Sequence, residues 1–372
     1  MKIRILTSNS ALVAAIQESF PHALIESISD VISIENSTCN ILIIDGTSFR
    51  LDVLYSQIAL IKARIIYLAD RDEKDIQYPG VTVFQYDGRL FVIVDELKKL
   101  VKSMVVYKNV LAFWSPVSGA GTTTTALTVM HGLPNGTRAL YLSLTDVPGI
   151  EYVSGIESSI SDILPRLISG VLEPQDLNAA CSEINGRYYL GGLNSYIDVT
   201  PYSLDDMKAL IAMAATYFDY VVIDAGYGAS LMAIAALSVS AHTYVVTTPS
   251  AIAALRYEQL NRQVYGNVPE IVMERLKLIT NMDNSAVLVS SRITKMYGIK
   301  PIATVRQAEE AIGIRATYES ALVYDLDTSG YRKDMSTLIS DIYTEIGVVQ
   351  TITRSVAGRR SILRGLFGAR RL

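Results

Sequence analysis

The stretch Val110-Leu-Ala-Phe-Trp-Ser-Pro-Val-Ser-Gly-Ala-Gly-Thr-Thr-Thr-Thr-Ala126 decides the fold of the larger part of the chain. Its first five residues are apolar and predict a buried strand, and the residues from Thr122 onward predict a helix. The loop between them consists of small residues. Such a loop lets backbone N–H groups approach a phosphate closely, while the helix points its N-terminus at it. The stretch therefore predicts a phosphate-binding loop.

This loop differs from the usual phosphate-binding loop at one decisive position. The lysine that normally follows the last glycine is replaced by Thr122, whereas Thr123 stands where a hydroxyl would hold magnesium. A tight strand-to-helix turn also favours glycine for its geometry alone, so the loop needs support from elsewhere in the chain. We expect a nucleotide to contact the residues of the loop and of the helix start, namely Ser118, Gly119, Ala120, Gly121, Thr122, Thr123 and Thr124.

A second hydrophobic strand supplies that support. Residues 218–224 read Phe-Asp-Tyr-Val-Val-Ile-Asp, which places Asp224 at the carboxyl end of the strand. In doubly wound sheets, ligands bind at this edge. Asp224 can hold magnesium there through water, while Thr123 binds the ion directly. The alternative is that Asp224 only ends its strand in a turn.

Composition is typical of a well-packed α/β protein. The chain has 372 residues, of which 50% are hydrophobic and 19% charged, and it is long enough for two domains. Cys39 and Cys181 fit no disulfide or metal pattern, so we expect a reduced, cytoplasmic environment. No stretch approaches the roughly 20 apolar residues of a spanning helix. The first residues are typical of a strand and not of a signal peptide.

The last twenty residues differ from the rest in charge. Residues 353–372 contain six arginines and no acid, whereas the remaining chain has 27 basic and 37 acidic residues. An acidic body argues against a nucleic-acid-binding surface. The tail, which carries apolar residues between its arginines, is either an amphipathic anchor on an anionic membrane surface or a disordered basic segment.

The apolar pattern divides the chain into two α/β domains, each with a doubly wound parallel sheet. Residues 1–105 alternate strands and helices and end in an amphipathic helix over Leu90–Met104. We expect a linker at Lys102–Asn109. A larger domain follows over 109–352, and its last strong helix is predicted at Lys333–Ile346. Its strands are predicted at Val110–Trp114, Ala139–Leu144, Tyr188–Leu190, Tyr220–Ile223, His242–Thr247, Leu276–Thr280 and near Ile302.

The loop at 118–125 together with the strand at 218–224 resembles the deviant phosphate-loop ATPases of the MinD/ParA class. Those proteins usually read Lys-Gly-Gly-x-Gly-Lys-Thr-Thr in the loop, so their two lysine positions are Val117 and Thr122 here. Loss of both lysines, together with a receiver-like N-terminal domain, is most similar to the TadZ/CpaE proteins of the Tad pilus and type IVc secretion machinery.

This resemblance implies a function. It implies an ATP-binding localisation or assembly factor for a Tad-type pilus or a type II/IV-like secretion apparatus, with ATP or ADP and Mg²⁺ bound. It further implies a homodimer, a secretion ATPase as partner, and a place in the cytoplasm, at the inner membrane face or at a cell pole. Asn281, at the end of a predicted strand, matches the position that contacts adenine in this class; an ordinary turn residue is the alternative.

The same resemblance predicts slow or absent hydrolysis. The class usually carries an aspartate after its second strand, but Ser143 and Thr145 stand at the matching positions, with Asp146 displaced in register. Phosphoryl transfer depends on positioned charge, and loop lysine, partner lysine and acid are all missing. We therefore name no catalytic residue. Two alternatives stay open: an active partition or cell-division ATPase, and a scaffold that binds no nucleotide.

The N-terminal domain also lacks the charged residues that phosphoryl transfer needs. Ile41–Asp45 places an acid where receiver domains carry their phosphoacceptor, but Thr7-Ser-Asn9 supplies no metal-binding acid and Phe84–Asp87 no lysine. Without that charge neutralisation, phosphoryl transfer to Asp45 lacks support. We interpret the domain as a receiver-like module for protein contacts and Asp45 as a turn residue rather than a phosphorylation site.

Overall fold

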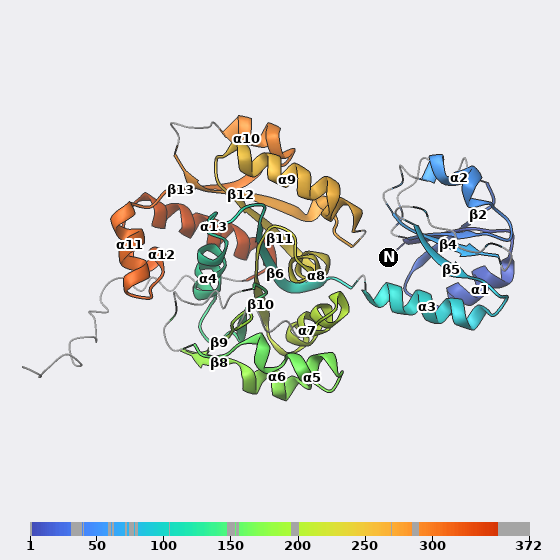
Figure 1. Ribbon diagram of the computed structural model, residues 1–372, viewed down its shortest axis with the longest axis horizontal. Coiled ribbons are helices and arrows are strands. Elements are labelled where there is room, and N and C mark those ends of the chain that lie inside the picture. Colours follow the sequence, from blue (N-terminus) through green and yellow to red (C-terminus); the bar gives the residue numbers. More distant parts are fainter. Residues whose placement is uncertain are drawn as a thin grey trace, which may run out of the picture.

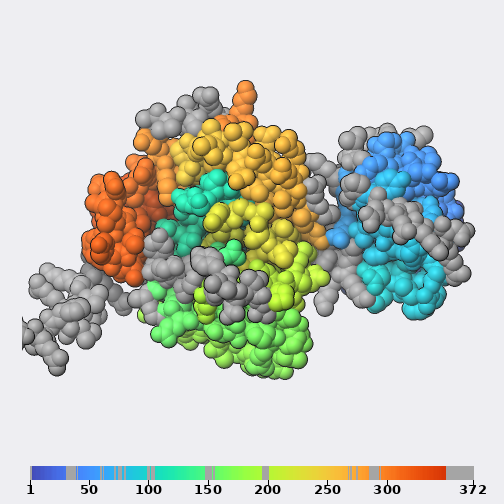
Figure 2. All heavy atoms as spheres, in the orientation of Figure 1, coloured from blue at the N-terminus to red at the C-terminus, as the bar shows by residue number. Residues whose placement is uncertain are grey.

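A computed structural model describes residues 2–30, 39, 41–58, 61, 63–70, 73, 78, 81–103, 105–146, 153, 156–194, 201–268, 270–284 and 290–348. Two sheets organise these residues, and Figures 1 and 2 show the smaller sheet with its helices as a lobe beside a larger one. None of the described helices has the length and apolar character needed to cross a membrane. The basic tail at 353–372 lies outside the described residues.

The smaller sheet has five parallel strands in the order β2-β1-β3-β4-β5, the flavodoxin-like order of a doubly wound fold. Helices α1 and α3 pack on one face and α2 on the other. The sequence prediction missed β2, whose short LIESI pattern is only partly buried. The elements are β1 Lys2–Leu6, α1 Ser10–Ser19, β2 Leu24–Ile28, β3 Ile41–Asp45, α2 Leu51–Ile58, β4 Arg64–Ala69, β5 Val81–Gln85 and α3 Leu90–Ser103.

The larger sheet has eight strands in the order β13-β12-β11-β6-β10-β7-β9-β8, all parallel except β8. The prediction missed β8, a three-residue strand of a hairpin that turns at Asn185-Gly186, where both residues have positive φ. The strands are β6 Tyr107–Ser115, β7 Ala139–Ser143, β8 Ser182–Ile184, β9 Arg187–Leu190, β10 Tyr220–Tyr227, β11 Ser240–Thr247, β12 Leu276–Asp283 and β13 Pro301–Arg306.

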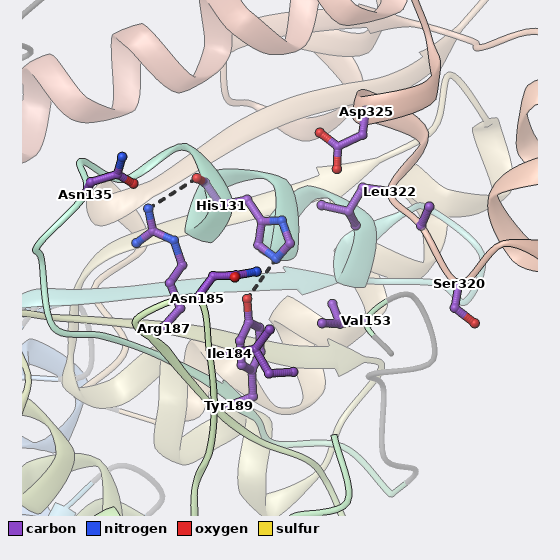
Figure 3. A pocket seen from close by; sticks show the side chains of 11 residues that line it. His131, Asn135, Val153, Ile184, Asn185, Arg187, Tyr189, Ser320, Leu322 and Asp325 are labelled. Atoms are coloured by element: carbon purple, nitrogen blue, oxygen red, sulfur yellow. Dashed lines mark hydrogen bonds between the residues drawn. The ribbon is translucent and has the colours of Figure 1, made fainter. Parts of the chain in front are cut away.

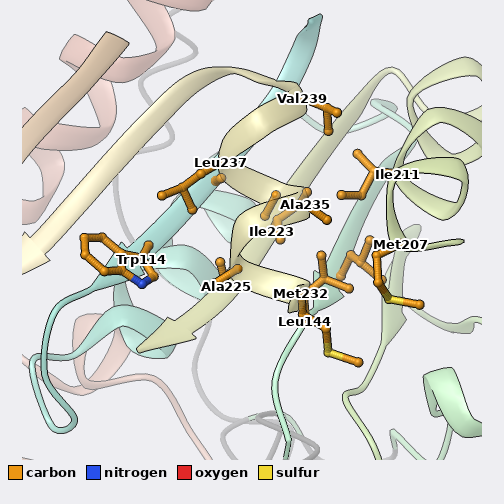
Figure 4. Packing of buried hydrophobic residues seen from close by; sticks show 14 of the residues in the cluster. Trp114, Leu144, Met207, Ile211, Ile223, Ala225, Met232, Ala235, Leu237 and Val239 are labelled. Atoms are coloured by element: carbon orange, nitrogen blue, oxygen red, sulfur yellow. The ribbon is translucent and has the colours of Figure 1, made fainter. Parts of the chain in front are cut away.

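Helices cover both faces of this sheet, because successive residues of its central strand β6 point to opposite sides. Leu111 and Phe113 belong to a core shared with α4 and α13. Val110, Ala112 and Trp114 belong to the opposite core, part of which Figure 4 shows around α8. The helices are α4 Thr122–Gly132, α5 Leu164–Ile168, α6 Pro174–Ala180, α7 Leu204–Tyr217, α8 Leu231–Val239, α9 Ala251–Gln263, α10 Ser290–Tyr297, α11 Glu310–Tyr318, α12 Val323–Leu326 and α13 Gly330–Ile346.

The predicted linker at Lys102–Asn109 is wrong at both ends. Helix α3 continues to Ser103, and β6 already begins at Tyr107. The strand is longer than its apolar core because Tyr107 still pairs with Ser240 of β11. The connection between the two sheets is therefore much shorter than the sequence indicated.

A charged cluster joins the two lobes. Arg64, the first residue of β4, pairs with Glu270 of the larger lobe, and the Nζ atom of Lys208 on α7 lies 3.6 Å from the same Glu270 oxygen. Burial alone would raise the pKa of Glu270, but the two cations outweigh burial and lower it. Arg64 begins its strand, so the contact is made at the amino end of the small sheet, away from Asp45 at the carboxyl end of β3.

Candidate functional site

The phosphate-binding loop joins β6 to α4 in a conformation that requires glycine at two positions. Gly119 and Gly121 have φ angles of +73° and +83°. A Cβ atom on Gly121 would lie only 2.4 Å from the Asn281 side-chain nitrogen. The loop begins with a local turn in which the Ser115 hydroxyl donates to the Val117 carbonyl at 2.7 Å. The predicted strand, loop and helix are therefore present, and backbone conformation fixes the path of the loop.

The predicted nucleotide contacts differ in how they face solvent. Ser118 and Gly119 are exposed, and Thr123 and Thr124 are half-buried. Ala120 and Thr122 are buried, and the Ala120 side chain belongs to the core beneath the loop. Ala120 can thus contact a phosphate only through its backbone. These residues lie at the N-terminus of α4, where main-chain N–H groups have no partner within the helix.

The two predicted magnesium residues meet at the carboxyl edge of the larger sheet. Asp224 is fully buried, and its neighbours across the parallel ladder are Phe113 and Ser143. The Thr123 hydroxyl donates to the Asp224 Oδ2 atom at 2.6 Å. This hydrogen bond ties the first turn of α4 to the end of β10. Asp224 as a magnesium residue and Asp224 as the residue that ends its strand in a turn both stay predictions.

Two further donors reach the same carboxylate. The Tyr141 hydroxyl on β7 donates to Asp224 Oδ2 at 3.1 Å, and the Gly226 backbone N–H donates to Oδ1 at 3.0 Å. Sequence reasoning missed Tyr141 because a tyrosine in an apolar strand is usually a core residue. The signal that could have found it is the register, since Tyr141 lies two residues before Ser143, the partner of Asp224.

Asn281 lies at the back of the loop, near the end of β12. Its side-chain nitrogen donates to the Ala120 carbonyl at 2.9 Å, and only 4% of the residue is exposed. The other amide atom, Oδ1, is buried and has no hydrogen-bond partner among the described residues. A buried acceptor without a donor is costly, by about 1–3 kcal/mol. This orphan atom is the feature of Asn281 that suits an external hydrogen-bond donor.

The positions after β7 carry hydroxyls instead of an acid. Ser143 and Thr145 are joined by a hydrogen bond of 2.8 Å between their hydroxyls. Thr145 lies over Gly226, where a Cβ atom would be 3.0 Å from the threonine methyl group. Asp146 is exposed. The displacement of Asp146 in register from the acid of the class stays a prediction.

Asp45 in the small sheet is held in a comparable way. Its carboxylate is fully buried and accepts hydrogen bonds from the Thr7 hydroxyl at 2.5 Å and the Thr47 hydroxyl at 2.7 Å. The Thr47 backbone N–H and the Ser48 hydroxyl donate to it as well. The bonds from Thr47 and Ser48 are local and fit the interpretation of Asp45 as a turn residue, whereas the bond from Thr7 joins the end of β3 to the loop after β1. Within the described part of the chain, no group of three or more His, Cys, Asp or Glu residues could hold a metal ion.

A pocket of about 410 Å³ lies at the opposite end of α4 from the loop (Figure 3). It is bounded by the end of α4, the β8–β9 hairpin and the α11–α12 turn. Arg187 donates to the His131 and Leu133 carbonyls and so caps α4. The Tyr189 hydroxyl lies 2.9 Å from the His131 Nε2 atom. The predicted nucleotide contacts lie at the loop, at the other end of α4, and line no part of this pocket.

Burial sets the protonation of the pocket residues. It lowers the pKa of His131, an effect that nearby Arg187 reinforces and Asp325 opposes. Burial also raises the pKa of Tyr189 to about 12. The neutral form of His131 is therefore favoured, and its Nε2 atom shares a hydrogen bond with the Tyr189 hydroxyl. The ring of Tyr189 packs against that of Tyr141, with centroids 6.3 Å apart, and Tyr141 in turn donates to Asp224.

Comparisons with known proteins bear on the fold. No protein-family model and no curated protein matches the chain. Among solved structures, the chain is similar to a ParA family ATPase from Chlorobium tepidum, with 19% identity and a TM-score of 0.56 over 63% of this chain and 99% of that chain. It is also similar to MinD from Pyrococcus horikoshii complexed with Mg-ADP, with 16% identity and a TM-score of 0.52 over 64% and 98%.

A third similar structure is the MinC:MinD cell division complex from Aquifex aeolicus, with 13% identity and a TM-score of 0.51 over 63% of this chain and 96% of that chain. At these identities the likeness shows the fold. The MinD/ParA-type P-loop fold that the two motifs predicted is thereby confirmed. The assignment to the TadZ/CpaE proteins and the receiver-like nature of the first domain stay predictions.

The lowered pKa of His131 predicts a pH-dependent stability. The unfolded chain binds a proton on this histidine at higher pH than the folded chain does, so the free energy of unfolding falls as pH drops below about 6.5. His131→Gln should reduce that fall between pH 7 and pH 5, as measured by urea unfolding. His22→Gln changes an exposed histidine and is the matched control. Equal pH profiles for wild type and His131→Gln would contradict the prediction.

Proposed function

We propose that the chain binds ATP or ADP with Mg²⁺ at the carboxyl edge of the larger sheet and acts as a localisation or assembly factor that hydrolyses ATP weakly or not at all. The observation that carries this proposal is the 2.6 Å hydrogen bond between Thr123 and Asp224. It brings the hydroxyl after the glycine loop and the acid at the adjacent strand end into one site. Those are the two groups that a phosphate loop uses to hold magnesium.

The residues present fit such a ligand. Backbone N–H groups and the positive end of α4 favour phosphate without any lysine. Thr123 keeps a lone pair for a metal ion while it donates to Asp224. The orphan Oδ1 atom of Asn281, beside the loop, could accept a hydrogen bond from the adenine amino group after a small rearrangement. When bound, magnesium would supply charge neutralisation for the phosphates. The Pyrococcus MinD structure with Mg-ADP is consistent with this assignment.

The same site is poorly equipped for turnover. Both lysine positions of the class are neutral here, Val117 and Thr122, and the hydroxyls of Ser143 and Thr145 stand where an acid would orient water. Charge that develops on the phosphates in the transition state is therefore opposed by fewer positioned groups. These substitutions support a role in which the bound nucleotide acts mainly as a structural ligand.

The placement in a Tad-type pilus or type II/IV-like secretion apparatus rests on the sequence. Loss of both loop lysines and an N-terminal doubly wound sheet of flavodoxin-like order support it. In this proposal a secretion ATPase is a partner, and residues 353–372 could contact an anionic membrane surface. An active partition ATPase is the alternative if turnover is fast. A scaffold is the alternative if nucleotide does not bind.

We further propose a homodimer formed over the nucleotide edge. Large apolar side chains are exposed where β10 and β12 end and where α8 and α9 begin, including Ile252 at 75% and Tyr227 at 63% exposure. Leu231, Leu255 and Met282 complete this apolar face. Large exposed apolar side chains gathered at one edge of a fold are typical of protein interfaces.

Thr123→Val should weaken the binding of Mg-ATP at least about tenfold, because the variant loses the hydrogen bond to a carboxylate that fixes the first turn of α4 beside the loop. Isothermal titration calorimetry measures this affinity. Thr128→Val is the matched control, since Thr128 lies on the same helix and its hydroxyl only bonds the Thr124 carbonyl. No detectable ATP binding by the wild type would favour the scaffold, and equal affinities of the two variants would remove Thr123 from the site.

Steady-state ATP turnover should be at least about 100-fold slower than in lysine-bearing members of the class. Removal of a single positioned electrostatic group commonly lowers the rate by about that factor. A coupled phosphate-release assay, with a lysine-bearing relative measured in parallel, gives the comparison. A similar rate for both proteins would support the active partition ATPase instead.

Ile252→Asp should reduce self-association in the presence of Mg-ATP, because it places a charge on the most exposed residue of the apolar face. Light scattering coupled to size-exclusion chromatography measures the mass. Ile314→Asp on α11 is the control, as Ile314 is 55% exposed outside the apolar face. A dimer that persists in Ile252→Asp, or a wild type that stays monomeric, would argue against this interface.

A further inference from the structure

The carboxylate of Asp224 receives two hydroxyl donors on one oxygen. Thr123 donates to Oδ2 at 2.6 Å and Tyr141 donates to the same Oδ2 at 3.1 Å. A carboxylate oxygen offers two lone pairs in its plane. Both acceptor positions of Oδ2 are thus used. Oδ1 accepts from the Gly226 N–H and keeps at most one further position.

A magnesium ion held through water needs an acceptor position on this carboxylate, either one on Oδ2 or the remaining one on Oδ1. In phosphate-loop proteins the ion is bound by the loop hydroxyl, and the strand acid accepts from water in the ion's shell. Thr123 can serve as ligand while it keeps its bond to Asp224. The Tyr141 hydroxyl, by contrast, uses the second lone pair of Oδ2, which a metal-bound water would otherwise occupy. Tyr141 and a metal-bound water therefore compete for Oδ2, which leaves the water at most the remaining position on Oδ1.

Tyr141 is held firmly in this position. The residue is fully buried in β7 and lies across from Val222 in the parallel ladder with β10. Its ring packs against Tyr189, with centroids 6.3 Å apart and planes inclined by 47°. A buried ring between two strands and α4 has few alternative rotamers. Displacement of its hydroxyl from Asp224 would leave a buried donor without that partner.

We propose that Tyr141 is a positioning residue that keeps the Thr123–Asp224 pair assembled without a metal ion, so that nucleotide binding depends only weakly on magnesium. This inference rests on the proposed nucleotide site and adds a property of it. The hydroxyl of Tyr141 supplies part of the hydrogen bonding that metal-bound water would give to Asp224. The small sheet uses the same means, since hydroxyls of Thr7, Thr47 and Ser48 hold the buried Asp45.

The test compares ATP affinity with excess Mg²⁺ and with EDTA in wild type, Tyr141→Phe and Tyr189→Phe. We expect the wild-type affinities to agree within about threefold. In Tyr141→Phe, the second lone pair of Oδ2 is free for a metal-bound water. The ratio of the ATP affinity with Mg²⁺ to that with EDTA should therefore be about fivefold to tenfold higher than in the wild type, which is what one hydrogen bond supplies. Tyr189→Phe removes a buried hydroxyl that faces His131 instead, and its ratio should equal that of wild type.

A second readout needs no nucleotide. Hydrogen exchange of the amides of Thr125 and Ala126, the first with acceptors inside the first turn of α4, should be slow in the wild type with or without MgCl₂. In Tyr141→Phe, we expect exchange about fivefold faster in EDTA and slowed again by MgCl₂. A merely structural tyrosine would give no such metal-dependent recovery.

The two measurements separate the two proposals. ATP that binds neither with Mg²⁺ nor with EDTA would end the proposed function, and hydrogen exchange would still decide the role of Tyr141. ATP that binds the wild type only with Mg²⁺, or a Tyr141→Phe variant that matches wild type in both readouts, would overturn the inference about Tyr141 while the nucleotide site stands.

Discussion

The carboxylate of Asp224 is fully buried at the carboxyl end of β10, and the geometry of this edge of the sheet follows from keeping it hydrogen-bonded. A buried charged acceptor left without partners costs several kcal/mol, of the order of 3 or more. Donors therefore come from three directions: Thr123 on α4, Tyr141 on β7 and the Gly226 backbone. Together they fix the start of α4 against two neighbouring strands. Through these hydrogen bonds to Asp224, the start of α4 and the glycine loop before it are held in place without a ligand.

The sequence allowed the central parts of this arrangement to be predicted. The strands β6, β7, β10, β11 and β12 have continuous apolar cores, and α4 follows a glycine loop, so pattern alone locates them. The pairing of Thr123 with Asp224 followed from strand ends meeting at one edge. The strands β2 and β8 were missed because they are short and only partly buried. Their pairing comes from neighbouring strands and not from their own pattern.

The contribution of Tyr141 lay beyond sequence reasoning for a different reason. Its neighbours Leu140 and Leu142 are apolar, so the strand pattern gives the tyrosine no special weight. Its role depends on the register between β7 and β10, which brings a side chain 83 positions away to Asp224. The partner of the Asn281 amide, the Ala120 carbonyl, likewise depends on how closely β12 approaches the loop. Distances across a sheet decide such contacts, and periodicity does not encode them.

Hydroxyls hold the buried acid at the carboxyl edge of both sheets, and this has one consequence for function. A neutral donor satisfies a carboxylate in the ground state but adds no positive charge when charge grows on a phosphate. Sites built this way keep the interactions needed for binding and lose those needed for turnover. If a nucleotide binds at Thr123 and Asp224 as proposed, its occupancy follows its concentration relative to the dissociation constant. The nucleotide concentration, and not a hydrolysis cycle, would then set how much of the protein is dimeric through the apolar face.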